Sequence, residues 1–115
     1  MKMVGIPPID VREITKLHEM LEADKIPHNF KHVFEEFPEW GMQLCYPVFD
    51  LETRVLSVIQ HIGSYGHEEG LLEIMGLLTD EELEHSDVAG WLTAEEVYER
   101  IKQHWSKENA TNKTL

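Results

Sequence analysis

Two β-rich runs separated by a short loop constrain the fold of this chain more than any other feature. The runs span residues 42–49 and 54–61, and the intervening residues 50–53, Asp-Leu-Glu-Thr, are typical of a hairpin loop. Side chains of the second run alternate between two faces, with Val55, Ser57, Ile59 and His61 on one face and Leu56, Val58, Gln60 and Ile62 on the other. The two faces are not equally apolar, which predicts an antiparallel sheet covered by helices on one side.

Helices are predicted before and after these strands. Three residue pairs have the spacing of a capping box at a helix start: Asp10 with Glu13, Thr79 with Glu82, and Thr93 with Glu96. The apolar spacing predicts helices from residue 10 to about 24, over 67–78, over 79–85, and from 93 to about 105. Trp91, just before the last of these helices, is expected to pack back onto Val97 as a hydrophobic staple.

The predicted fold class is therefore α+β. A three-stranded antiparallel sheet, with its first strand near residues 29–34, is packed by the N-terminal and C-terminal helices in the order α-β-β-β-α-α-α. The expected core contains Ile14, Leu17, Leu21, Val58, Leu72, Met75, Val97, Ile101 and Trp105.

The length of 115 residues fits a single domain with one core. We expect an N-terminal arm at residues 1–9, the α+β domain at 10–106 and a polar tail at 107–115. No apolar run approaches the roughly 20 residues that span a bilayer, and the first residues lack the apolar core of a signal peptide. Cys45 is the only cysteine, which suits a reducing compartment. Together these features predict a cytoplasmic protein that does not enter a membrane.

The charge of the chain is strongly uneven. The net charge is −12, and no Lys or Arg stands between Arg54 and Arg100. Such a surface repels nucleic acid and attracts basic partners, so direct binding of nucleic acid is not expected. The residues predicted to form a partner-binding face are Asp80, Glu81, Glu82, Glu84, Asp87, Glu95, Glu96 and Glu99. The alternative is that these carboxylates serve only solubility and helix starts.

The glycine-containing loop at residues 61–67 is the second candidate site. Its predicted ligand-binding residues are His61, Ser64, Tyr65 and His67. Glycines before a helix let backbone N–H groups approach an anion, although Glu68 and Glu69 would repel a phosphate there. The loop matches no nucleotide-binding fingerprint. A tight connection that needs glycine at positive φ is the competing interpretation.

Catalytic and metal signatures are weak. Of the seven histidines, His28 and His32 are four apart in a segment expected to be extended, too far apart to share an ion. Glu82-x-x-His85 has the spacing of half a di-metal carboxylate site but has no second copy. Cys45 is expected to be a small buried side chain within a strand. We therefore assign no cofactor, no metal ligands and no catalytic residues, and enzyme activity is the less favoured alternative.

The runs at residues 54–66, 71–78 and 88–97 resemble small uncharacterised proteins of phages and prophages of Gram-positive bacteria. The resemblance covers roughly residues 10–105. It implies an accessory, phage-type role in the cytoplasm and transfers no functional residues, because that family has no assigned activity. The preferred function is thus binding of another protein, for example a basic host nucleic-acid enzyme, through the carboxylate-rich face. The alternative is a small metal- or nucleotide-dependent enzyme or ligand-binding domain using the 61–67 loop. A homodimer is compatible with either.

Overall fold

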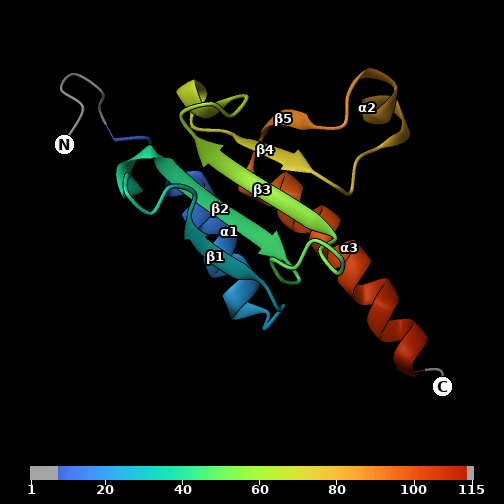
Figure 1. The fold of residues 1–115 in the computed structure, drawn as a ribbon. Coiled ribbons are helices and arrows are strands. Elements are labelled where there is room, and N and C mark those ends of the chain that lie inside the picture. Colours follow the sequence, from blue (N-terminus) through green and yellow to red (C-terminus); the bar gives the residue numbers. More distant parts are fainter. Residues whose placement is uncertain (1–7, 114–115) are drawn as a thin grey trace.

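A computed structural model describes residues 8–113 and shows a five-stranded sheet with two long helices behind it (Figure 1). The elements are α1 (Arg12–Ala23), β1 (Asn29–His32), the 3-10 helix η1 (Pro38–Trp40), β2 (Gly41–Tyr46), β3 (Leu56–His61), the 3-10 helix η2 (His67–Glu69), β4 (Leu72–Met75), α2 (Asp80–His85), β5 (Ala89–Leu92) and α3 (Ala94–Lys113). The strands follow one another in the order β1-β2-β3-β4-β5, and every neighbouring pair is antiparallel.

The predicted hairpin is confirmed as β2 and β3, which pair Tyr46 with Leu56 and Leu44 with Val58. The predicted loop of residues 50–53 is too short, because β2 ends at Tyr46 and β3 begins at Leu56, so that residues 47–55 connect the strands. The alternation along β3 is also confirmed, because Leu56, Val58 and Gln60 are all buried while the residues between them are partly exposed. This face of the sheet lies against the helices, so the period of two in the sequence decided which side chains enter the core.

The α+β class and the antiparallel sheet are confirmed, but the predictions of three strands and of a helix over residues 67–78 are wrong. Residues 72–75 form β4, which pairs with β3. Gly70 and Gly76 flank this strand with φ of 72° and 105°, values that no α-helix contains. The apolar residues at 71–78 fit a helical stripe and a short strand about equally well, and hydrogen bonding to β3 decides between them.

The helix order is also wrong, because β5 lies between α2 and α3. Residues 89–92, which form β5, show no alternation of apolar and polar side chains in the sequence. In the structure the pairing of β5 with β4 is irregular, and Trp91 has a φ of 57°. A bulge of this kind removes the period of two on which strand prediction depends.

The core forms between the sheet and the two long helices. Ile14, Leu17 and Leu21 of α1 and Val97 and Ile101 of α3 are buried, as predicted. The prediction fails at Met75, which is 54% exposed because β4 turns it toward the opposite face of the sheet. The remaining members of the predicted core behave as expected: Val58 and Leu72 are buried and Trp105 packs against the core while partly buried.

Two polar contacts attach the helices. The Gln60 side chain of β3 is fully buried, and its Oε1 accepts a hydrogen bond from the Ile14 backbone N–H at 3.1 Å. A Glu13 carboxylate oxygen accepts from the Ala94 N–H at 2.6 Å. Each contact satisfies a backbone donor in the first turn of a helix, α1 and α3 respectively. The capping box predicted for Asp10 and Glu13 is therefore wrong, because Glu13 instead serves the start of α3.

The other two capping boxes are confirmed, at Thr79 with Glu82 and at Thr93 with Glu96. Residues 107–113, expected to be a polar tail, continue α3 to Lys113, whereas residues 1–7 of the predicted arm lie outside the described residues. Among the helices at residues 8–113, none combines the length and the apolar character needed to cross a membrane.

We predict that Gly41→Ala strongly destabilises the protein. Gly41 has a φ of 136°, and an added Cβ would lie 2.4 Å from the backbone oxygen of Gln60 and from the Cα of His61. Backbone atoms of a central strand cannot move aside easily, so we expect the free energy of unfolding to fall by about 3 kcal/mol. Urea unfolding measures this quantity.

Gly63→Ala is the matched control, because the nearest atom to its Cβ would lie 3.4 Å away, an ordinary contact. Equal stability of the two variants would contradict the tight approach of β2 to β3 at Gly41.

Candidate functional site

The structure divides the predicted acidic face into carboxylates with partners and carboxylates on the open surface. Glu82 forms a two-pronged ion pair with Arg100, at 2.7 and 2.8 Å, and also accepts from the Thr79 N–H at 2.8 Å. Glu95 is paired with Lys16, and Glu96 accepts from the Thr93 backbone N–H. The other members of the predicted set, Asp80, Glu81, Glu84, Asp87 and Glu99, are exposed. Glu95 and Glu96 are exposed as well, although Glu95 forms an ion pair and Glu96 caps α3.

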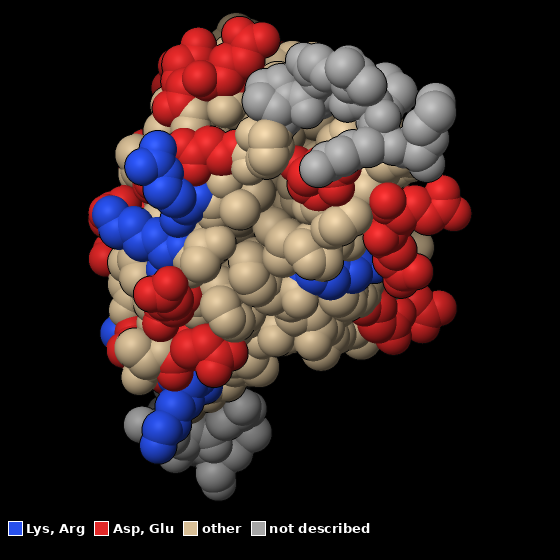
Figure 2. Space-filling view, turned by 90° about the vertical axis from the view of Figure 1, so that its left-hand side faces the viewer, with Lys and Arg blue, Asp and Glu red and all other residues tan. Residues whose placement is uncertain are grey.

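Bases from outside the acidic segment approach it in space. Lys16 comes from α1 and Arg100 from α3, and each pairs with a carboxylate of the segment. The absence of bases between Arg54 and Arg100 in the sequence is therefore only partly an absence of bases in space. Figure 2 shows a different side of the molecule, the one that lies to the left in Figure 1 and away from α2, where Lys and Arg stand among Asp and Glu.

The 61–67 loop is held together by its own polar groups. Ser64 Oγ accepts from the His61 N–H and donates to the His61 carbonyl, both at 3.0 Å. His67 Nδ1 donates to the Ser64 carbonyl at 2.6 Å, and His61 Nδ1 accepts from the Gly63 N–H at 2.9 Å. Burial lowers the pKa of His61, against a smaller opposite effect of Glu73. Ser64 is only 3% exposed, so its hydroxyl is committed to the turn and offers no accessible nucleophile.

Tyr65 is the predicted loop residue that reaches solvent. It is 55% exposed, and its ring stacks on Trp91 with centroids 5.6 Å apart and planes 20° apart. Gly66, at φ 94°, and Gly90 permit this contact: a Cβ on Gly90 would lie 2.5 Å from Tyr65 Cβ. The expectation that the loop needs glycine at positive φ is confirmed at Gly66.

Beside the Tyr65–Trp91 stack lies a hollow of about 200 Å³, which we call the aromatic hollow. Its lining contains Ser64, Tyr65, Gly66, His67, Glu68, Glu69 and Trp91. Three of the four predicted ligand-binding residues thus line one hollow, and His61 does not. Carboxylates and aromatic rings in one small concave surface favour a positively charged guest.

Trp91 is the lining residue from outside the 61–69 segment, and the sequence did not predict it as part of a site. The expected staple onto Val97 is wrong, since Trp91 is 55% exposed. The residue directly before the Thr93 cap is Leu92, which is buried in the core and occupies the staple position instead. Counting back from Thr93 would have predicted this assignment.

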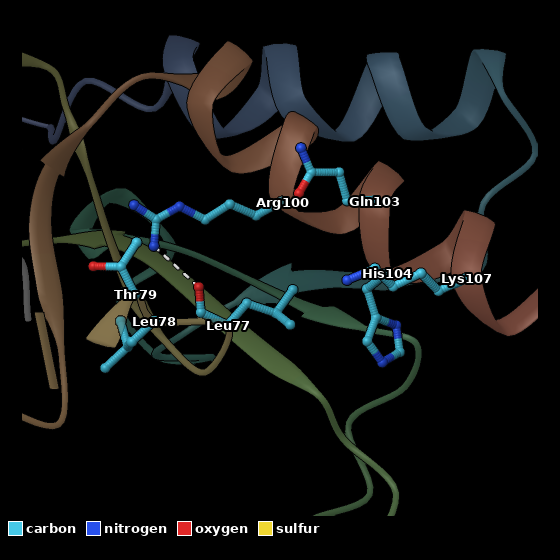
Figure 3. A pocket seen from close by; sticks show the side chains of 7 residues that line it. All are labelled: Leu77, Leu78, Thr79, Arg100, Gln103, His104 and Lys107. Atoms are coloured by element: carbon cyan, nitrogen blue, oxygen red, sulfur yellow. Dashed lines mark hydrogen bonds between the residues drawn. The ribbon is translucent and has the colours of Figure 1, made fainter. Parts of the chain in front are cut away.

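A second hollow, of about 260 Å³, lies between the 77–79 turn and α3 (Figure 3). Its lining contains Leu77, Leu78, Thr79, Arg100, Gln103, His104 and Lys107. Arg100 crosses it to donate to the Leu77 carbonyl at 3.0 Å, and His104 Nδ1 lies 2.7 Å from the Tyr46 hydroxyl, whose pKa is raised to about 12 by burial. These contacts join α3 to the sheet and its 77–79 turn, which is a structural role.

Three possible metal ligands also come together in the described part of the chain: His18, Glu22 and His28. From the sequence, His28 is compared only with His32, and His18 is missed as a possible ligand. The signal was present, because His18 and Glu22 are four residues apart on a predicted helix and so share one face.

No protein-family model, no curated protein and no solved structure matches this chain.

We predict that Glu82→Gln makes stability less sensitive to acid. Hydrogen bonds from Arg100 lower the pKa of the Glu82 carboxyl to about 2, from an ordinary value of 4.5. The ionised carboxylate therefore stabilises the fold above about pH 4.5, and this contribution is lost as the pH falls toward 2. At neutral pH we expect Glu82→Gln to lower the free energy of unfolding by about 1–2 kcal/mol, allowing for partial exposure of the pair.

Urea unfolding at neutral and at acidic pH measures the difference, with the exposed neighbour Glu81→Gln as control. A deficit in Glu82→Gln that stays constant down to strongly acidic pH would contradict this role of the ion pair.

Proposed function

We propose that the protein is a binding module for a basic segment of another protein, which it holds at the aromatic hollow. The observation that carries the proposal is the exposed Tyr65–Trp91 stack beside Glu68 and Glu69. Tyr and Trp are enriched among the residues that dominate binding energy at protein interfaces. Lys and Arg side chains bind both aromatic faces and carboxylates, so this combination fits them better than it fits an acidic or apolar guest.

The backbone at Trp91 supports a functional role for its ring. A φ of 57° is unusual for a bulky residue and costs on the order of 1–3 kcal/mol. The irregular pairing of β5 with β4 accompanies this conformation, and the ring projects beside Tyr65. A stable fold alone gains little from a strained residue whose large side chain remains more than half exposed.

The exposed carboxylates of α2 would assist by attracting a basic partner over a longer range. Asp80, Glu81 and Glu84 lie on this helix, and Figure 1 places α2, β5 and η2 along the upper part of the molecule. Charges at the rim of an interface mainly increase the association rate. A phage-type accessory role, a cytoplasmic location and the absence of direct nucleic-acid binding remain predictions that this module would satisfy.

A nucleotide-dependent enzyme is the less supported alternative. Glu68 and Glu69 line the hollow and would repel phosphate groups, while Ser64 is buried in its own turn. The arrangement offers a surface for recognition and no paired nucleophile and base within the hollow.

The proposal predicts that Trp91→Ala and Tyr65→Ala each weaken the binding of an arginine-rich peptide about tenfold, because each removes one face of the stack. Isothermal titration calorimetry at low salt measures the affinity, and a peptide in which Glu replaces Arg is the charge control. Leu51→Ala, at a residue that is 77% exposed in the β2–β3 loop, is the matched control and should bind like the wild type. Equal affinities for all three variants would refute the aromatic hollow as the binding site.

Two double variants distinguish the effect of net charge from the effect of the carboxylates that line the aromatic hollow. Glu68→Gln with Glu69→Gln, and Glu81→Gln with Glu84→Gln, each remove two carboxylates, but only the first pair lines the hollow. The variant with Glu68→Gln and Glu69→Gln should increase the dissociation rate of the peptide, because it lacks the two carboxylates that we propose contact the guest. Identical dissociation rates for both double variants would show that net charge alone attracts the peptide.

Reversal of charge on α2 should slow association several-fold without changing the fold. Glu81→Lys with Glu84→Lys is the suitable variant, whereas adding Glu82→Lys would break the ion pair with Arg100. Stopped-flow mixing with the arginine-rich peptide at low and high salt measures the rate. If the rate and its salt dependence equal those of the wild type, the carboxylates of α2 are only solubilising.

A further inference from the structure

The end of α1 and the turn after it bring two imidazoles and a carboxylate to one point. His18 and Glu22 are four residues apart on α1 and share a face. The chain then reverses through Lys25, at φ 56°, and the buried Ile26, whose N–H donates to the Leu21 carbonyl at 3.0 Å. This reversal places His28, the last residue before β1, against the side chains of the helix.

The distances are short enough for a shared ion. His18 Nδ1 lies 2.8 Å from His28 Nε2, and His28 Nε2 lies 3.5 Å from Glu22 Oε1. All three possible ligand atoms lie within 4.8 Å of one another. Two ligand atoms on a tetrahedral zinc ion lie about 3.3 Å apart, so the imidazole nitrogens need to separate by only about 0.5 Å.

The His28 ring is held in place by a hydrogen bond, whereas the Glu22 side chain is exposed and can adjust to an ion. His28 Nδ1 donates to the Ile26 carbonyl at 2.8 Å, which leaves the lone pair of Nε2 directed at the shared point. This contact is the usual outer partner of a metal-bound histidine, and it fixes both the tautomer and the ring orientation. The His28 side chain is 2% exposed, whereas Glu22 is 63% exposed and can swing inward.

The His18 ring is also fixed. It stacks on Phe30 of β1, with ring centroids 4.5 Å apart and planes 16° apart. Without metal, the His18 Nδ1–H donates to the lone pair of His28 Nε2. With metal, the proton of His18 moves to its other ring nitrogen, and both lone pairs that meet here bind the ion.

From this geometry we propose that His18, Glu22 and His28 form a binding site for one divalent transition-metal ion, Zn²⁺ being the best match. Two neutral imidazoles and one carboxylate suit Zn²⁺, whereas Mg²⁺ and Ca²⁺ prefer oxygen ligands alone. Water or a group from a partner completes the fourth position. Of the three ligands, Glu22 lies in the last turn of α1, where the helix dipole also favours a cation. The site fastens the end of α1 to the start of β1 and is separate from the aromatic hollow.

The test uses the full chain, purified without a histidine tag, and Zn²⁺ alone as the probe. Competition with a chromophoric chelator measures the affinity and stoichiometry. We expect one tight site per chain, and a loss of about tenfold or more in His18→Phe and in Glu22→Gln. Phe at position 18 keeps a ring against Phe30, and position 22 is exposed, so both variants are expected to fold.

His85→Gln and Glu19→Gln are the matched controls. Both residues are exposed, and Glu19 precedes Glu22 by one turn of the same helix. Both controls should bind Zn²⁺ like the wild type. The proposal is overturned if the wild type binds no stoichiometric Zn²⁺, or if the controls lose as much affinity as the ligand variants.

A spectroscopic readout identifies the ligands independently of affinity. In ¹⁵N-histidine NMR spectra, addition of one equivalent of Zn²⁺ should shift Nδ1 of His18 and Nε2 of His28, with the ring nitrogens of the other histidines unchanged. Shifts confined to other histidines would overturn the assignment.

Discussion

The structure depends on burial of one face of the sheet beneath α1 and α3. Leu56 and Val58 of the central strand supply apolar contacts on that face, and Gln60 supplies a polar one at the same depth. Gln60 Oε1 satisfies a backbone donor at the start of α1, but its Nε2 has no hydrogen-bond partner in the described structure. An unsatisfied buried donor costs about 1–3 kcal/mol. The buried Gln60 side chain therefore adds little net stability, and its main effect is to fix the position of α1 on the sheet. Glu13, one residue before Ile14, then binds the start of α3, so one turn of α1 is joined both to β3 of the sheet and to α3.

Within residues 8–113, the two long helices both lie on one face of the sheet, and exposed apolar side chains occur on the opposite face and at the adjoining loops. Met75 is turned outward, and Trp91 is held in a strained conformation beside Tyr65. An exposed aromatic stack and nearby carboxylates are what a protein interface for a basic segment needs. The ion pair of Glu82 with Arg100 has the opposite character, since it joins the start of α2 to α3 and is part of the fold.

The proposed metal site and the aromatic hollow lie at opposite edges of the sheet. The metal ligands adjoin β1 and the hollow adjoins β5, with three strands between these edges. Both sites arise where a turn brings a residue back against an earlier element: His28 against α1, and Trp91 against the 61–67 loop. Occupation of the metal site would hold the β1 edge, while the β5 edge remains available to a partner.

The sequence alone determined the features that depend on local periodicity. These are the β2–β3 hairpin, the two faces of β3, the apolar stripe of α1, and the capping boxes at Thr79 and Thr93. It placed three of the four loop residues that line the aromatic hollow, because they are adjacent in the chain. The tertiary structure alone decided that residues 72–75 form a strand, since their apolar pattern fits two periods and pairing with β3 selects one. It also decided the partners of Glu82, Tyr65 and His28, because those contacts join residues that no local rule connects: Arg100, Trp91 and His18.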